Sequence, residues 1–444
     1  GISMPLTKWS IQVTSAEEIP TALAKAFFIA KSGRPGPVLV DITKNAQMES
    51  FKYSYSSCTG IRSYHPEPEV KQTSLQEAAD LIESAERPFI VFGHGVILGN
   101  AQDQFKTFVE NSGIPCASTI MGLSALETDH PLHMGMLGMH GNYAPNVLTN
   151  ECDVLIAVGM RFDDRVTGDL SRYAKQAKVI HLDIDPAEIG KNVPVDVTVL
   201  GDCKKSLHGL TQLVKKKTYP SWLNRFSECK EEEWEKVIEP EIIPDTASKL
   251  KMAEVIHQLS VLTKGKATIV TDVGQHQMIA QRYYNFSRWR SNVTSGGLGT
   301  MGFALPAALG AKLAQPKNLV VAVIGDGGFQ MTVQELGTVL QTGVALKILI
   351  LNNEFLGMVR QWQDLFFDKR YSSTEMMNPD FQMIAKGYGI KAEKVTERKE
   401  LGPSLNRFIH EEGAFLLEVM VGKEDNVFPM VPTGSSVSDI KLEP

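Results

Sequence analysis

Two apolar runs that lie close together in the chain, at 319–324 and 344–351, constrain the fold most strongly. Both runs are rich in β-branched residues and have the length of strands, so they predict two buried parallel strands that are joined by a helix. A polar signature ends each run: Gly-Asp-Gly at 325–327 and Asn-Asn at 352–353. Because ligands of an open parallel sheet bind beyond the carboxyl ends of its strands, we expect the two signatures to meet in one crevice.

The chemistry of these signatures indicates a magnesium and phosphate site. The carboxylate of Asp326 and the amide of Asn353 offer oxygen, which Mg²⁺ prefers, and glycines let backbone N–H groups approach a phosphate. Thr332 and Glu335 have the spacing of a capping box, which predicts a helix whose amino end points at that anion. Taken singly, each signature is more often a turn or a loop. The pair at neighbouring strand ends favours the binding site.

The rest of the chain alternates strands and helices, which predicts an α/β fold with doubly wound parallel sheets and helices on both faces. A helix at 17–32 and a strand at 38–42 follow a lead-in without regular structure, and they are too few to form a complete core. We expect these parts: the end of a domain (1–45), a polar linker (46–70), a middle domain (71–215), a charged linker (216–246), a last domain (247–430) and a short tail (431–444). The strands expected in the two larger domains are 88–92, 114–118, 153–158 and 178–183, then 268–273, 319–324, 344–351 and 415–421.

Composition excludes several classes of function. The net charge of −6 and the pI of about 6.0 give no basic surface for nucleic acid or an anionic membrane. The five cysteines have no CxxC spacing, which argues against a zinc site or a disulfide framework and for a reducing compartment. No apolar run approaches the length of a membrane span. We therefore expect a globular protein whose ligands are small molecules.

The opening motif and the residues after it resemble one enzyme family. A Gly-Asp-Gly, then 24 residues and Asn-Asn, followed by LGMVRQW at 356–362, is similar to the cofactor motif of thiamine-diphosphate enzymes, and in particular of acetohydroxyacid (acetolactate) synthases. The resemblance implies a partial pyrimidine-binding domain, a middle flavin-binding domain and a diphosphate-binding domain. It also implies that Mg²⁺ is held by Asp326, Asn353 and the backbone carbonyl of Phe355.

The resemblance further assigns roles in the last domain. The carbonyl of Gly299 would accept from the cofactor's amino group, Met301 would support its thiazolium ring, and Met358 and Trp362 would line the pocket of the second substrate. The residues expected to hold thiamine diphosphate are Val273, Gly274, Gln275, His276, Gly325, Asp326, Gly327, Gly328, Leu356 and Gly357.

The segment RFDDRVTG, at 161–168, places two arginines and two aspartates after a predicted strand. Such a cluster is also common in surface ion-pair networks, but its guanidinium groups suit a diphosphate or a carboxylate. The segment resembles the flavin-binding part of the family, where Arg161 and Asp163 would contact FAD and Arg165 would bind the acceptor carboxylate. The other flavin contacts that the resemblance implies are Arg34, Thr119, Ile120, Met121, Leu137, Gly138, His140, Gly159, Asp183, Ile184 and Asp202. His94 departs from the family, which has glycine there, and we expect it to crowd the flavin diphosphate.

The implied function is decarboxylation of pyruvate and condensation of the hydroxyethyl unit with a second 2-oxo acid, pyruvate or 2-oxobutyrate. The products would be acetolactate or acetohydroxybutyrate, for branched-chain amino-acid biosynthesis. The implied partners are thiamine diphosphate, Mg²⁺, a structural FAD, and a second copy of the chain in a homodimer or homotetramer with sites at the subunit interface, with a regulatory small subunit as a further candidate.

Three points stay open at this stage. Another family member, such as a glyoxylate carboligase or a pyruvate oxidase, and an inactive nucleotide-binding fragment are the alternatives. The family's activating glutamate, which belongs to an amino-terminal domain, matches no residue here. The expected location is the cytoplasm, or an organelle if a transit segment preceded residue 1.

Overall fold

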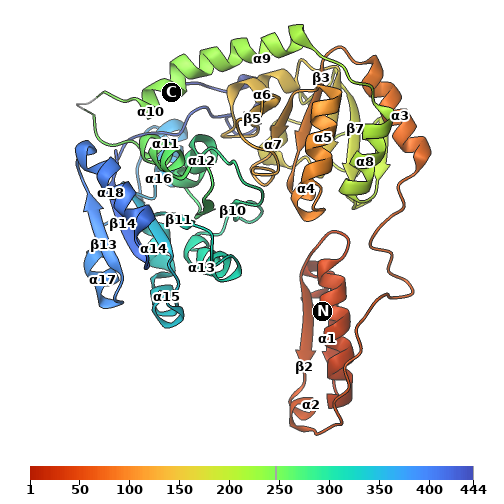
Figure 1. Ribbon diagram of the computed structural model, residues 1–444, viewed down its shortest axis with the longest axis horizontal. Coiled ribbons are helices and arrows are strands. Elements are labelled where there is room, and N and C mark those ends of the chain that lie inside the picture. The colour runs from red at the N-terminus through yellow and green to blue at the C-terminus, as the bar shows by residue number, and fades with distance from the viewer. Residues whose placement is uncertain (246–247, 444) are drawn as a thin grey trace.

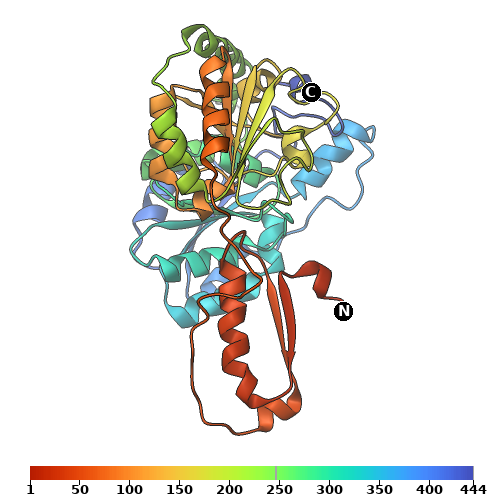
Figure 2. The same ribbon diagram turned by 90° about the vertical axis from the view of Figure 1, so that its right-hand side faces the viewer.

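The computed structural model describes residues 1–245 and 248–443, and within them the strands form three parallel sheets (Figure 1). One sheet has two strands and belongs to an amino-terminal unit that projects from the rest of the molecule in both views (Figures 1 and 2). The other two sheets have six strands each. The expected boundary between 246 and 247 and the last residue of the tail lie outside the described residues.

The amino-terminal unit contains a strand that the sequence analysis missed. Strand β1 (Trp9–Val13) pairs in parallel with β2 (Val38–Ile42), so the expectation of an irregular lead-in is wrong. The two strands are joined through α1 (Ile19–Lys31), whose alanines lie against the sheet. Short elements complete the unit: η1 (Met4–Leu6), η2 (Ala16–Glu18) and α2 (Lys44–Met48).

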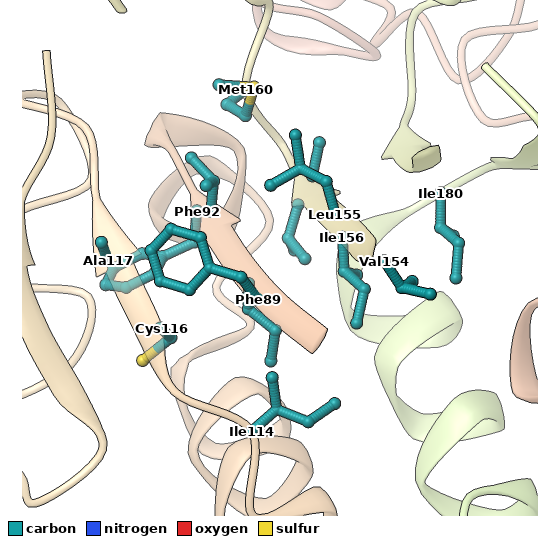
Figure 3. Packing of buried hydrophobic residues seen from close by; sticks show 14 of the residues in the cluster. Phe89, Phe92, Ile114, Cys116, Ala117, Val154, Leu155, Ile156, Met160 and Ile180 are labelled. Atoms are coloured by element: carbon teal, nitrogen blue, oxygen red, sulfur yellow. The ribbon is translucent and has the colours of Figure 1, made fainter. Parts of the chain in front are cut away.

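The middle sheet has the strand order β5-β4-β3-β6-β7-β8. Its two central strands are completely buried, which explains their continuous apolar sequences. Figure 3 shows the aromatic side chains of one of them packed among residues of the neighbouring strands. The strands are β3 (Pro88–Phe92), β4 (Cys116–Ser118), β5 (His133–Met136), β6 (Val154–Val158), β7 (Lys178–Asp183) and β8 (Val197–Leu200), and the helices are α3 (Gln72–Ser84), α4 (His94–Leu98), α5 (Gln102–Ser112), α6 (Tyr143–Thr149), α7 (Asp164–Thr167) and α8 (Cys203–Leu213).

The last sheet has the order β10-β9-β11-β12-β14-β13 and is covered on both faces. Alternate residues of β11 enter two separate cores, since Val321 and Val323 join one and Val320 and Ala322 the other. The strands are β9 (Thr268–Thr271), β10 (Asn292–Thr294), β11 (Val320–Gly325), β12 (Lys347–Asn352), β13 (Lys391–Val395) and β14 (Phe415–Met420). The helices are α11 (Met252–Thr263), α12 (Gln275–Tyr283), α13 (Ala304–Ala314), α14 (Asp326–Met331), η4 (Val333–Glu335), α15 (Leu336–Thr342), α16 (Gly357–Phe366), α17 (Phe381–Gly387) and α18 (Arg398–His410).

Regular elements also form in the segments at 220–242 and 437–439. The charged linker forms α9 (Pro220–Glu233), η3 (Trp234–Ile238) and α10 (Glu239–Ile242), and α9 runs across the top of the molecule between the two large sheets (Figure 1). The tail returns to the middle sheet, where η5 (Val437–Asp439) buries Val437 in the core. Among the helices of the described residues, none is both long and apolar enough to cross a membrane.

The predicted capping box is wrong. The helix after β11 begins at Asp326, and the Thr332 side chain caps no helix. Its hydroxyl donates instead to the carbonyl of Gly302, 3.1 Å away, in the glycine-rich loop at 295–303 between β10 and α13. A tertiary contact therefore replaces the local one that the spacing suggested.

Candidate active site

The two polar signatures meet at the carboxyl ends of adjacent strands. β11 pairs with β12, so Asp326 and Asn353 follow adjacent strands of the sheet. Both lie just beyond the last residues that pair between these two strands. Asp326 is 1% exposed, and this burial raises the pKa of its carboxyl to about 6. A cation beside the carboxylate would oppose that shift, because an opposite charge favours the ionised form.

Asn378, which the sequence analysis did not single out, connects the two signatures. Its side-chain nitrogen donates to Asp326 Oδ2 at 2.7 Å and to Asn352 Oδ1 at 3.2 Å. Its oxygen accepts from Gln330 Nε2 at 2.8 Å. The amide is thus held on both sides and fixes the direction of the Asp326 carboxylate.

The two asparagines have different positions. Asn352 points back into the sheet, where it donates to the buried carboxylate of Glu418 at 2.7 Å and accepts from the backbone N–H of Glu354 at 2.9 Å. This second bond closes a turn in which Glu354 has φ of +57°, an unusual value for a residue with a side chain. Asn353, the next residue, is also buried, and its Oδ1 accepts from the backbone N–H of Phe355 at 3.3 Å. The donors expected beside Asp326 remain the Asn353 amide and the Phe355 carbonyl. One carboxylate, one amide and one carbonyl form a donor set that fits Mg²⁺.

Glycines at this crevice are required by close contacts with neighbouring side chains. A Cβ atom added at Gly325 would lie 2.8 Å from His276 Nδ1, and one at Gly357 would lie 2.2 Å from Gln275 Oε1. At Gly327 it would meet the side chain of Leu356 at 2.8 Å. Each glycine therefore allows a neighbouring side chain to pack directly against its backbone.

His276 supplies an unused polar atom. Its ring is 5% exposed, and Nε2 is buried without a hydrogen-bond partner among the described residues. Burial lowers the pKa of the imidazole to about 4, so the ring is neutral. A buried polar atom without a partner costs free energy unless a ligand satisfies it, and a neutral N–H suits a phosphate oxygen.

Asp272 is a second residue that the sequence analysis missed. Its Oδ1 accepts from the backbone N–H groups of Val273 at 2.8 Å and Gly302 at 3.0 Å, and its Oδ2 accepts from that of Ala304 at 3.0 Å. These bonds attach the glycine-rich loop, with Gly299 and Met301, to the end of β9. The sequence signal that could have identified Asp272 was an acid at the end of a predicted strand, directly before Val273 and Gly274. In the structure this acid is fully buried.

A cavity of about 950 Å³ lies beside this crevice and is lined by the middle domain, the last domain and residues near Arg34. Every residue expected to contact a flavin lines it: Arg34, Thr119, Ile120, Met121, Leu137, Gly138, His140, Gly159, Arg161, Asp163, Asp183, Ile184 and Asp202. Segments far apart in the chain therefore converge on one volume. Its volume is near the upper end of the range of about 300–1,000 Å³ for small-molecule and cofactor sites.

The expected substrate residues reach the same cavity from two domains. Arg165 comes from the middle domain, and Gly299, Met358 and Trp362 come from the last domain, together with Val273. The residues of the metal crevice are not part of the lining, and neither are Met301, Gly274 and His276. The structure thus separates a polar crevice from a larger cavity, and Gly299 and Val273 lie between them.

The arginine cluster contains ion pairs and also lines the cavity. Asp163 caps α7 by accepting from the backbone N–H of Arg165 at 3.0 Å, and its Oδ2 lies 3.3 Å from Arg161 Nε. Arg165 is largely exposed. Its Nε lies 3.9 Å from Asp164 Oδ2, which is a long distance for an ion pair. Its guanidinium is therefore available to a ligand in the cavity.

His94 also lines the cavity, in the position where crowding was expected. Its Nδ1 lies 3.0 Å from the carbonyl of Met121, so the ring is tied to the neighbouring loop. A Cβ at Gly93 or Gly95 would approach Gly159 to 2.6 or 2.5 Å. Side chains are thus excluded at the flanking positions and accepted at 94.

Comparison with known proteins matches two separate parts of the chain to family models. The family model described as the central domain of thiamine pyrophosphate enzymes matches residues 75–210, and the model of their C-terminal TPP binding domain matches 272–419. The acetolactate synthase large subunit of Lactococcus lactis is 40% identical over 98% of this chain and 75% of its own length. The isozyme 2 large subunit of Escherichia coli is 40% identical over 99% and 78%.

The chain belongs to the acetolactate synthase large-subunit family. A probable acetolactate synthase large subunit of Methanocaldococcus jannaschii, an archaeal relative, is also 40% identical over 99% of the chain and 76% of its own length. Membership identifies the crevice at β11 and β12 as part of a thiamine pyrophosphate binding domain. The α/β fold with parallel sheets, predicted from the alternation of strands and helices, is confirmed.

Proposed function

We propose that this chain catalyses the acetolactate synthase reaction, in which pyruvate loses CO₂ and its remaining two-carbon unit joins a second 2-oxo acid. The products are acetolactate from pyruvate and acetohydroxybutyrate from 2-oxobutyrate. The observation that carries the proposal is that Arg165 and Trp362, from different domains, line one cavity next to the thiamine domain's crevice. A carboxylate-binding cation and an apolar wall are what a 2-oxo acid acceptor requires.

Thiamine diphosphate supplies, when bound, the reactive carbon and the electron sink that the cleavage of pyruvate needs. The glycines at 325–328 and the neutral His276 ring would hold its diphosphate. Asp326, Asn353 and the Phe355 carbonyl would hold the Mg²⁺ that links the diphosphate to the protein. The oxygen-only donor set and the unpartnered His276 nitrogen support this arrangement.

Arg165 would bind and orient the acceptor. Its exposed guanidinium can pair with a carboxylate in a two-point contact, which fixes the direction of the adjacent carbonyl. Trp362 packs against Phe366 with ring centroids 5.0 Å apart, and together with Met358 it forms an apolar wall. That wall would exclude water from the place where the acceptor reacts.

A flavin adenine dinucleotide is the ligand that we propose for the cavity of about 950 Å³. The condensation transfers no net electrons, so its role would be structural. We also propose assembly into homodimers or homotetramers, and a regulatory small subunit as a partner. Leu298 and Met377, which lie in the loops near the crevice and are 95% and 98% exposed, support a protein surface that another subunit covers.

The test is an assay of the full-length protein with thiamine diphosphate, Mg²⁺ and FAD. We expect acetolactate from pyruvate alone and acetohydroxybutyrate when 2-oxobutyrate is added. Release of CO₂ without either product would overturn the proposal. Pyruvate-dependent reduction of the flavin, with transfer to an external acceptor, would instead assign the chain to an oxidase.

A further inference from the structure

Gln361 is a polar side chain of the interior to which neither the fold nor the proposed reaction gives a role. It lies in α16, directly before Trp362, and is completely buried. Its amide forms two hydrogen bonds with one backbone unit: Oε1 accepts from the N–H of Val427 at 2.8 Å, and Nε2 donates to the carbonyl of Val427 at 3.2 Å. The same helix holds this segment at a second point, where Asn426 Nδ2 donates to Asp364 Oδ2 at 2.8 Å. Helix α16 and the segment after β14 are thus fixed to each other.

A second buried amide, that of Gln275, connects Gln361 to the metal crevice. Gln275 begins α12 and is 5% exposed. Its Nε2 donates to Gln361 Oε1 at 2.9 Å and to the backbone carbonyl of Asp425, also at 2.9 Å. Its Oε1 accepts from Nδ2 of Asn353 at 3.3 Å. Gln361, Gln275 and Asn353 therefore form an amide series, which runs from the backbone of Val427 to a residue expected to hold Mg²⁺.

The backbone decides which way the first two amides point. The oxygen and the nitrogen of a side-chain amide are alike in shape, so packing alone does not choose between its two orientations. A backbone N–H only donates and a carbonyl only accepts, so Gln361 has to turn its oxygen to the Val427 N–H. Gln361 Oε1 and the Asp425 carbonyl are both acceptors, so Gln275 has to turn its nitrogen to them. The Gln275 oxygen then faces Asn353.

The third amide of the series is the expected metal ligand. Because the Gln275 oxygen only accepts, Asn353 has to present its nitrogen to Gln275 and its oxygen to the other side. That oxygen accepts one bond, from the backbone N–H of Phe355 at 3.3 Å, and has a second lone pair. Mg²⁺ binds amides through oxygen, and a reversed Asn353 would offer it N–H groups instead. The amide series thus determines which atom of Asn353 a metal ion meets.

Gly357 shows how closely the last two amides of the series are packed. A Cβ atom added at Gly357 would lie 2.2 Å from Gln275 Oε1 and 2.7 Å from Asn353 Nδ2. Helix α16 begins at this glycine, so its backbone lies directly against the two amides. The same helix carries Met358 and Trp362, which line the cavity. The direction of the metal ligand and the wall of the cavity therefore both depend on the placement of one helix.

We propose that Gln361 is a positioning residue for the metal site, because it sets, through Gln275, the direction of the Asn353 oxygen. The inference rests on the proposed binding of Mg²⁺ by Asp326, Asn353 and the Phe355 carbonyl. Side chains that orient a metal ligand from behind typically change the metal affinity by about 10–100-fold when they are removed. The loss of Gln361 should therefore be visible in Mg²⁺ binding itself, apart from catalysis.

The experiment measures the Mg²⁺ concentration that gives half-maximal binding of thiamine diphosphate to the full-length protein, followed by tryptophan fluorescence. The Tm of each ligand-free variant is recorded beside it. We expect Q361M, which loses both polar atoms of the amide, to require about tenfold more Mg²⁺ than wild type. Q361E keeps an oxygen toward Gln275, so its Mg²⁺ requirement should rise by no more than about twofold.

The matched control is Q363M. Gln363 lies in the same helix and forms the same pair of bonds with one backbone unit, that of Ser372, both at 3.1 Å. It is half-buried, and its two bonds end at Ser372 instead of continuing to a metal ligand. Q363M should therefore leave the Mg²⁺ requirement within about twofold of wild type, whatever its effect on Tm.

A double variant tests whether Gln361 acts through Gln275. In a Q275M background the amide series is already broken, so adding Q361M should change the Mg²⁺ requirement by less than about twofold. Q275M also keeps the test decisive if Q361M does not fold, because an unchanged Mg²⁺ requirement in Q275M would by itself overturn the inference.

Four further results would overturn the inference and leave the proposed metal site standing. They are an unchanged Mg²⁺ requirement in Q361M, equal effects of Q361M and Q363M, equal losses in Q361M and Q361E, and full additivity of Q361M and Q275M. A wild-type protein that binds thiamine diphosphate without any dependence on Mg²⁺ would overturn the metal site as well.

Discussion

The buried ion pair between Glu233 and Arg282 offers the sharpest test of how the domains are held together. Both side chains are 1% exposed, and the Glu233 carboxylate accepts from Arg282 Nη2 at 2.6 Å. It also accepts from the side chain of Asn142 at 3.0 Å and the backbone N–H of Tyr143 at 2.8 Å. Glu233 ends α9, Arg282 belongs to α12, and the other two residues lie in the middle domain, so one carboxylate joins three parts of the chain.

The variant R282M removes the cation that pairs directly with Glu233 and leaves the carboxylate buried with two neutral donors. Breaking a buried pair in this way costs about 3–5 kcal/mol. For a unit of 150–250 residues, about 2–4 °C of Tm is lost per kcal/mol, so we expect the first thermal transition to fall by roughly 6–20 °C. Differential scanning calorimetry of the full chain measures it.

The double variant E233M/R282M separates charge from packing. It leaves neither charge of this pair. The remaining cost, about 1–3 kcal/mol, comes from the Asn142 side chain and the Tyr143 N–H, which lose the carboxylate that accepts from them. It should therefore be more stable than R282M alone. The control is R225M. Arg225 lies in α9, the helix of Glu233, and its ion pairs with Glu151 and Glu228 are half exposed, so their loss should cost less than about 1 kcal/mol. Equal effects of R282M and R225M, or a double variant no better than R282M, would refute the reasoning.

Three further predictions concern the two large domains. N378A should weaken Mg²⁺ binding in the presence of thiamine diphosphate about tenfold, measured by calorimetry, because Asn378 orients a metal ligand, whereas the exposed neighbour M377A should have no effect. G328A should weaken thiamine diphosphate binding at least tenfold, since its Cβ would lie 2.8 Å from the buried Asp272 Oδ1. The control is G310A, whose Cβ would have nothing within 4 Å, and equal affinities of the two variants would contradict a role of Gly328 in the diphosphate site. Burial lowers the pKa of His133 to about 4, so between pH 6.5 and 4 the folded state binds fewer protons than the unfolded state, and stability falls as the pH falls through that window. H133Q should therefore remove about 2 kcal/mol of the stability that wild type loses between pH 7 and 5, measured by thermal melts at both pH values. An unchanged loss would show that His133 does not titrate in that range.

The central strands of both large sheets were predictable, and the edge strands were not. β3, β6, β11 and β12 are completely buried on both faces, so each appears as an unbroken apolar run that begins and ends within a few residues of the predicted range. The edge strand β13 has the sequence KAEKV and is mostly half exposed, and its polar residues conceal it. Its pairing with β14 supplies the structure that its own sequence does not specify.

The sequence by itself determined the chemistry at the ends of β11 and β12, because Asp326 and Asn353 follow their strands directly and the parallel sheet brings those ends together. Only the tertiary structure decided what holds and completes the site. Asn378 reaches Asp326 across 52 residues, and Glu418 reaches Asn352 across 66. Local patterns carry information about neighbours in the chain, whereas such contacts depend on packing between elements whose spacing no short motif records.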